Sequence, residues 1–214
     1  MPETVEISVF RLGELDDHAK IRARDWYRQH ALEDHWYDTA FDDFENVCGI
    51  LGIELKANFV RLLGGGLRQQ PCIYFSGFSS QGDDAFFEGR YTYRAGSGQA
   101  VRSYAGKDTE LHRIADTLMA IQRRNFYQLT ASVSHRGRYF HECSMEISVE
   151  RTSAAGQPAC GAAEDLVVET LRDVARWLYR QLEAEFDYQR SDDVVDEAIL
   201  ANDFRFTQDG SLYA

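Results

Sequence analysis

Two stretches of alternating side chains constrain the fold of this 214-residue chain more than any other feature of its sequence. Apolar and polar side chains alternate over residues 129–134 and again over 142–150, and His135-Arg136-Gly137-Arg138 lies between them as a turn. The apolar series is Leu129, Ala131 and Val133, then Cys143, Met145, Ile147 and Val149. Successive side chains of a strand point to opposite faces, so the pattern predicts an antiparallel hairpin with one buried and one solvated face.

Helical patterns surround this hairpin. Apolar residues at helical spacing and acidic first turns predict helices over residues 16–32, 33–51, 107–121, 163–188 and 191–202. Further strands are predicted over residues 5–10, 53–63 and 204–206. We therefore expect a single α+β domain over 1–214, with 163–202 as its C-terminal helical part. Its antiparallel sheet should have about five to seven strands, with helices packed on one face or end.

The most specialised stretch is a second predicted hairpin, from Cys72 to about Arg94. Aromatic residues occupy both arms, and the loop reads Ser79-Ser80-Gln81-Gly82-Asp83-Asp84. Glycine adopts positive φ readily and aspartate bonds its own backbone, so Gln81-Gly82-Asp83 is typical of a turn. A second interpretation makes Asp83, Asp84 and Glu88, with His141, a carboxylate site that holds a cation or transfers protons. A third uses the aromatic arms as a platform for single-stranded nucleic acid.

Charge divides the chain into three parts. The net charge is −12, made up of −7 in residues 1–45, +3 in 46–163 and −8 in 164–214. Acidic ends repel nucleic acid and favour a basic partner. The acidic residues considered as binding residues in the N-terminal helices are Asp16, Asp17, Glu33, Asp34, Asp42 and Asp43. The hairpin contributes Gln81, Asp83, Asp84 and Glu88.

Motifs for metal, cofactor or nucleophilic chemistry are not recognised in this sequence. The four cysteines, Cys48, Cys72, Cys143 and Cys160, form no C-x-x-C pair, and we expect all to be reduced and buried. By alternation His141 shares the face of Cys143 and Met145, which favours a core histidine over a ligand. We therefore predict no catalytic residue, no metal site and no cofactor.

Targeting and membrane segments are likewise not recognised. No apolar run approaches the roughly 20 residues of a membrane helix, and residues 1–5 have no signal-peptide pattern. We expect a cytoplasmic protein that does not contact a membrane.

Part of the first hairpin resembles a motif of uncharacterised proteins of phages and proteobacterial prophages. That motif reads aromatic-Ser-Gly-aromatic, Ser-Gln-Gly-Asp-Gly, then Phe and Gly, and residues 74–89 follow it closely. Residues 110–116 and 199–207 are similar to that family as well. Asp84 stands where the family usually has Gly, so strain is expected there if that position needs positive φ. Some members are labelled antitoxins of toxin–antitoxin systems.

The resemblance implies a phage or prophage accessory protein in a bacterial host cell, and the sequence favours a non-enzymatic role. We expect it to bind a basic host protein or a nucleic-acid-binding complex, as an anti-CRISPR-like inhibitor or an antitoxin does. Direct binding of nucleic acid is not expected, and a homodimer is an alternative. The enzymatic alternative is a carboxylate-based, metal-dependent hydrolase at residues 79–88. A further alternative is a single-stranded nucleic-acid binder that uses the aromatic sheet.

Overall fold

A computed structural model describes residues 6–32, 35–78, 80–137, 141–153 and 156–213. The chain divides into two compact units, one of residues 1–38 and 183–214 and the other of residues 39–182. We call them the terminal unit and the central unit. Within the described residues, no helix combines the length and the apolar character needed to span a bilayer.

An antiparallel sheet of four strands forms the centre of the central unit, in the order β1-β6-β7-β8. Its strands are β1 (Ile53–Leu55), β6 (Gly89–Thr92), β7 (Leu129–His135) and β8 (Met145–Arg151). Leu129, Ala131 and Val133 are buried on one face, while Ser132 and Ser134 are exposed on the other. The predicted hairpin of alternating residues is therefore confirmed as β7–β8, with Ala131 opposite Val149.

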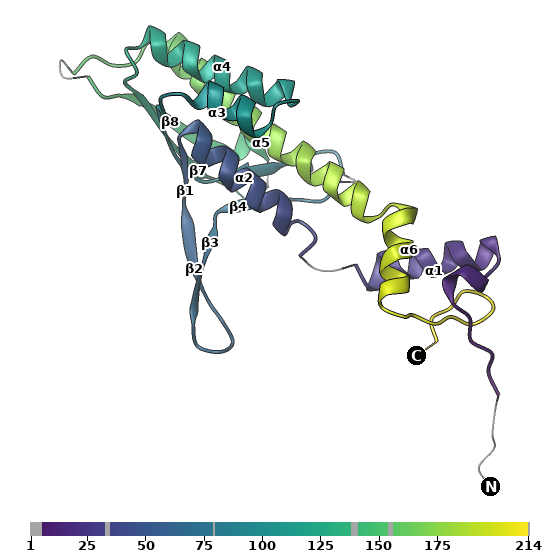
Figure 1. Cartoon of the computed structure of the whole chain (residues 1–214). Coiled ribbons are helices and arrows are strands. Elements are labelled where there is room, and N and C mark those ends of the chain that lie inside the picture. Colours follow the sequence, from purple (N-terminus) through teal and green to yellow (C-terminus); the bar gives the residue numbers. More distant parts are fainter. Residues whose placement is uncertain (1–5, 33–34, 79, 138–140, 154–155, 214) are drawn as a thin grey trace. The chain divides into compact units, whose positions relative to one another are not determined.

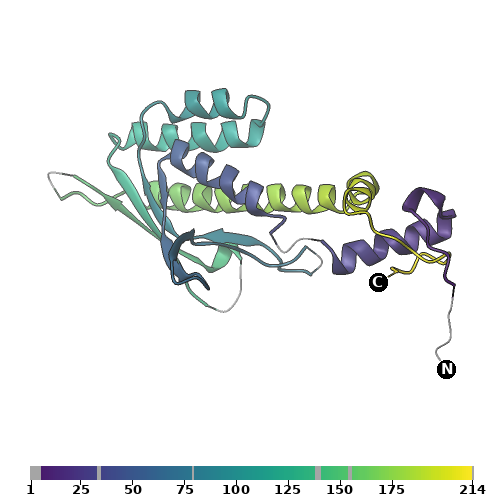
Figure 2. The same ribbon diagram turned by 60° about the horizontal axis from the view of Figure 1, so that its bottom comes forward.

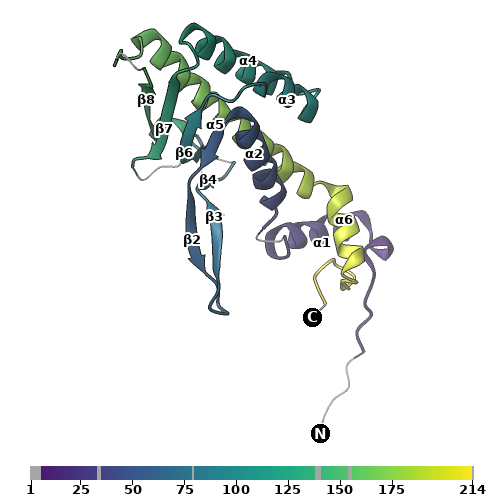
Figure 3. The same ribbon diagram turned by 60° about the vertical axis from the view of Figure 1, so that its left-hand side comes forward.

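Helices cover the apolar side of this sheet (Figures 2 and 3). They are α2 (Asp38–Leu51), α3 (Ser97–Tyr104), α4 (Thr109–Arg124) and α5 (Gly161–Gln189). Phe44 of α2 is fully buried, with its ring centroid 5.5 Å from that of Phe87 and 6.4 Å from that of Trp177 on α5. Aromatic packing of this kind joins helices to strands in one core.

Two small antiparallel sheets complete the central unit. One pairs β4 (Ile73–Phe75) with β5 (Ala85–Phe87), and the other pairs β2 (Ala57–Arg61) with β3 (Leu67–Pro71). The α+β class is confirmed, with six α-helices and eight strands among the described residues, in antiparallel sheets of four, two and two strands. The β2–β3 hairpin, which we call the arm, extends beyond the four-stranded sheet (Figures 1 and 3).

The first predicted hairpin is shorter than its sequence indicated. The pairing of β4 with β5 ends at Phe87, and from Gly89 the chain joins the four-stranded sheet as β6. A Cβ at Gly89 would lie 2.4 Å from the carbonyl oxygen of Glu54 in β1. Glycine therefore permits the close approach of two strands at the point where the chain changes sheets.

The terminal unit is built on α1 (Asp17–His30) and α6 (Asp192–Ala201), with a short 3-10 helix η1 (Leu12–Glu14). Their apolar faces enclose a core that includes Ala23, Tyr27, Ile199 and Phe206. The strands predicted over residues 5–10 and 204–206 are reduced, among the described residues, to the bridge between Phe10 and Phe206. Two elements that the sequence patterns did not indicate are α3 and β3.

Removal of the α1 cap tests the helix start within the terminal unit. The Asp16 carboxylate accepts a hydrogen bond from the Ala19 N–H at 2.8 Å. Asp16→Ala is therefore expected to lower the free energy of unfolding by about 1 kcal/mol. Ser191 is the N-cap of α6 but makes no capping hydrogen bond with its side chain, so Ser191→Ala is the matched control and should cost less. Equal losses in urea denaturation of the two variants would contradict the assignment of the cap.

Candidate functional site

A short 3-10 helix brings three consecutive polar side chains together in the central unit. This helix, η2 (Glu142–Ser144), precedes β8, and His141 is its N-cap. The Cys143 N–H donates a hydrogen bond to His141 Nδ1 at 3.0 Å. In an extended strand residues 141 and 142 would point to opposite faces, and the turn of η2 removes this separation.

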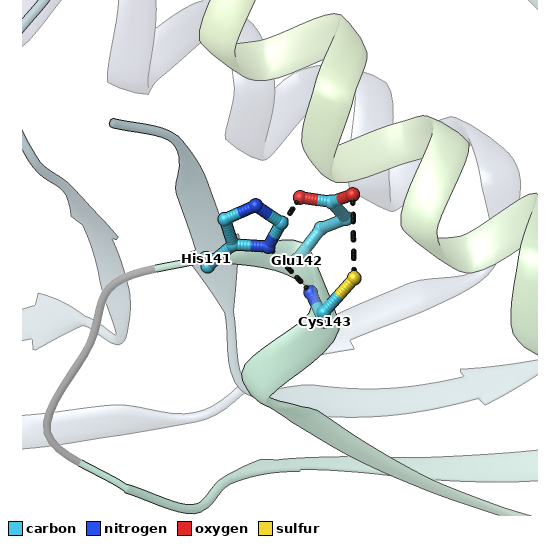
Figure 4. Close-up of side chains that lie close together, drawn as sticks. All are labelled: His141, Glu142 and Cys143. Carbon is cyan, nitrogen blue, oxygen red and sulfur yellow. Dashed lines mark hydrogen bonds and ion pairs between the residues drawn. The ribbon is translucent and has the colours of Figure 1, made fainter. Parts of the chain in front are cut away.

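The carboxylate of Glu142 lies between its two neighbours (Figure 4). One oxygen, Oε2, is 2.8 Å from His141 Nδ1, and the other, Oε1, is 3.6 Å from Cys143 Sγ. The ligand atoms of these three residues all lie within 4.8 Å of one another. Glu142 is buried, whereas Cys143 is exposed, so the group opens toward solvent on the thiol side.

Asp84 joins this group from the end of the 76–84 loop. Its Oδ2 atom is 3.6 Å from His141 Nδ1 and accepts the Glu142 N–H at 3.1 Å. Its Oδ1 atom accepts the Ala85 N–H at 2.8 Å. Burial raises the pKa of the Asp84 carboxyl, while the Ala85 N–H, His141 and Arg176 act in the opposite direction. We call Asp84, His141, Glu142 and Cys143 the polar cluster.

Arg176 of α5 supplies a positive charge beside the polar cluster. Its Nε and Nη2 atoms each lie 3.3 Å from Glu142 Oε1. The Nη1 atom of the same guanidinium donates to Glu169 and Asp173, at 2.8 Å each. A guanidinium shared among three carboxylates orients Glu142 without neutralising the whole group.

The other polar residues of the 79–88 hairpin do not meet at one site. Asp83 accepts the Ser80 N–H at 2.7 Å, which is the turn chemistry that the sequence predicted. Glu88 forms an ion pair with Lys56 at 2.8 Å, and Gln81 is exposed. Asp84 is not at positive φ, so the strain considered for that position is absent. Only Asp84 and His141 of the proposed carboxylate site are brought together.

The acidic residues of the N-terminal helices have separate roles. Asp16 caps α1, Asp17 and Asp42 are exposed, and Asp43 accepts a hydrogen bond from the Tyr104 hydroxyl. Glu33 and Asp34 lie outside the described residues. In the terminal unit, Arg24 and Arg28 form ion pairs with Asp192, and Arg24 also with Asp196. Part of the acidic surface predicted for a basic partner is thus neutralised within the unit itself.

Three predictions from the alternating pattern near the polar cluster are wrong. Cys143 is exposed and Glu142 is buried, because the strand begins at Met145 and the alternation does not extend into η2. His141 is partly exposed and bonded to polar neighbours, so it is not a core histidine. Cys48 and Cys72 are buried as predicted, but Cys160 is exposed as well as Cys143, and all four thiols are free.

Aromatic residues of the first hairpin do not form an exposed platform. Phe86, Phe87 and Tyr91 are buried in the core, so their ring faces are not available to bases. Exposed apolar side chains gather instead on the arm, where five large ones are between 43% and 112% exposed. They are Phe59, Val60, Leu62, Leu63 and Leu67.

Sequence reasoning missed Glu142, Cys143 and Arg176 as members of one group. The tripeptide His141-Glu142-Cys143 contains three potential metal ligands, and this composition was the available signal. Its alternation with the following strand residues indicated opposite faces and concealed that signal. Nothing in the sequence around Arg176 connects α5 with residue 142.

Comparisons with known proteins give one family. Searches of curated proteins and of solved structures found no match. The model of one family, described as "Domain of unknown function (DUF8835)", matches residues 36–192, which is more than half of the chain. These residues include the whole central unit except its first part, residues outside it on α5, and every member of the polar cluster. The chain therefore belongs to the DUF8835 family, whose description is "Domain of unknown function".

Proposed function

We propose that this protein acts without catalysis, by binding another protein, and that the arm makes the contact. The exposure of five large apolar side chains on one two-stranded hairpin supports this proposal. An isolated pair of strands is marginally stable in water and gains from a partner that covers it. Clustered exposed apolar residues are typical of interaction sites, whereas single ones are ordinary.

Charge on the arm indicates the chemistry of its partner. Residues 57–71 contain Arg61 and Arg68 and no acidic residue, although the chain as a whole carries −12. A complementary surface is apolar at its centre and carries acidic side chains around it. Two arginines on an otherwise acidic chain provide little attraction for nucleic acid, which favours a protein as the partner.

The resemblance to phage and prophage proteins supports a bacterial, cytoplasmic setting for this contact. A basic host protein or nucleic-acid-binding complex, bound through the acidic helices as an anti-CRISPR-like or antitoxin-like protein would bind it, is the weaker proposal. Arg22, Arg24 and Arg28 already pair with acidic side chains of the terminal unit. The hydrolase alternative loses Asp83 and Glu88 as partners of Asp84, because both carboxylates are engaged elsewhere.

Photo-crosslinking from the tip of the arm tests the proposal. With a photoreactive residue in place of Leu63, we expect defined crosslinked products in cells of the natural host. Phe59→Ser combined with Leu67→Ser should reduce these products about tenfold or more, because the truncation of two anchors in an interface costs over 1 kcal/mol each. Light scattering of the purified protein shows whether the partner is a second copy.

The matched control places the photoreactive residue at Leu166, which is also apolar and exposed but lies on α5. It should give no defined product. If position 63 gives no more product than position 166, and the purified protein is monomeric, the arm is not a binding surface.

A further inference from the structure

We propose that the polar cluster is a binding site for a zinc ion, with His141, Glu142, Cys143 and Asp84 as its ligands. This site is independent of the arm and of the function proposed for it. Its donors are one imidazole nitrogen, one thiol sulfur and two carboxylates, which together form a mixed set of the kind that zinc accepts.

Hydrogen bonding around His141 points to a missing cation. The Cys143 N–H points at Nδ1 from 3.0 Å, so it requires the lone pair of that nitrogen. The same Nδ1 atom lies 2.8 Å from Glu142 Oε2 and 3.6 Å from Asp84 Oδ2. A ring that keeps its lone pair on Nδ1 has no proton there to offer the carboxylates, so three electron-rich atoms meet without a positive partner between them.

Burial makes this arrangement costly unless a cation completes it. Asp84 and Glu142 are each only 7% exposed, and two carboxylates in such a place need compensating charge. Arg176 supplies one positive charge and is shared with Glu169 and Asp173. With the Cys143 thiolate as a ligand, three negative charges face the divalent ion and the arginine, and the local sum is zero.

Distances between the donor atoms fit a small ion. Tetrahedral zinc with bonds of about 2.0 to 2.3 Å separates its ligand atoms by roughly 3.3 to 3.7 Å. The Asp84–His141 and Glu142–Cys143 separations of 3.6 Å lie in that range. The 2.8 Å approach of Glu142 to His141 needs only a small widening, which the exposed side of His141 and Cys143 allows.

Four protein ligands from two separate segments would make this a structural site. Asp84 precedes β5, whereas residues 141–143 precede β8, so a shared ion ties two distant parts of the chain together. Arg176 extends the link to α5. Bound zinc is therefore expected to stabilise the fold of the central unit.

Titration of the metal-stripped full-length protein with Co²⁺, followed by Zn²⁺ competition, tests the site. One Co²⁺ should bind with the visible bands of a tetrahedral ion and a thiolate charge-transfer band, and Zn²⁺ should displace it. Zn²⁺ at a free concentration of 100 times its Kd should raise the Tm by roughly 5 to 10 °C.

Two cysteine variants locate the thiol ligand. Cys143→Ser should abolish the charge-transfer band and weaken binding at least tenfold, and His141→Gln should also weaken it. Cys160→Ser is the matched control, since Cys160 is another exposed free thiol of the same unit, and it should change neither property. Far-UV circular dichroism verifies that each variant is folded. The absence of a thiolate band in the wild-type protein, or its survival in folded Cys143→Ser, overturns the proposal.

Discussion

Gly52→Ala is expected to lower the free energy of unfolding of the central unit by about 2 to 5 kcal/mol. Gly52 has a φ of +87°, which costs an L-residue about 1 to 2 kcal/mol. A Cβ at this position would also lie 2.2 Å from the carbonyl oxygen of Thr92. The Thr92 N–H donates to the Gly52 carbonyl at 2.9 Å, so neither backbone can move away without the loss of that bond where β1 meets β6.

Gly96→Ala separates the two causes of this loss. Gly96 has a similar φ of +79°, but a Cβ there would meet no atom within 4 Å. It should therefore show only the conformational cost of about 1 to 2 kcal/mol. Thermal and urea denaturation, followed by circular dichroism, measure both variants. If the two losses agree within about 0.5 kcal/mol, the close approach of the backbones at Gly52 is not a determinant of stability.

Gln122→Leu is expected to destabilise the central unit by about 2 to 4 kcal/mol, although it adds an apolar side chain to an apolar core. Gln122 is fully buried, and its amide donates to the Leu129 carbonyl at 2.7 Å and accepts the Leu129 N–H at 3.2 Å. Leucine leaves both backbone groups buried without these partners, and each unsatisfied group costs about 1 to 3 kcal/mol.

Tyr91 gives a graded comparison for this result. The Gln122 amide also approaches the Tyr91 hydroxyl at 3.3 Å, and burial raises the pKa of Tyr91 to about 12. Tyr91→Phe should cost less than Gln122→Leu, because Leu129 keeps its side-chain partner. Gln99→Leu, at an exposed position of α3, is the control and should change stability by less than about 0.5 kcal/mol. A loss from Gln122→Leu no larger than the control would show that Leu129 finds other partners.

Local sequence patterns predicted those elements whose side chains carry their own period. The alternation at Leu129 to Val133 identified β7, and the acid at residue 16 marked the start of α1 correctly. The arm was only half predicted, because the first strand has apolar residues and the second, Leu67–Pro71, is polar and exposed. An exposed strand has no buried face and therefore shows no alternation.

The candidate sites were less accessible to sequence reasoning. Asp84 and His141 were both considered, but Glu142 was assigned to the solvated face and Arg176 was not considered at all. A single turn of 3-10 helix changed the direction of three side chains, and such a turn has too few residues for a periodic signal. The exposure of the arm also could not be predicted, since apolar residues such as Phe59 and Leu67 are more often buried.

By itself, the sequence determined the α+β class, the β7–β8 pairing and the acidic ends, because each follows from the spacing or charge of neighbouring residues. Only the tertiary structure decided that Asp84 meets His141, Glu142 and Cys143, that Gln122 satisfies Leu129, and that the arm is left uncovered. These features depend on which distant backbones come together. That choice is made by the burial of the whole apolar surface, which no local pattern contains.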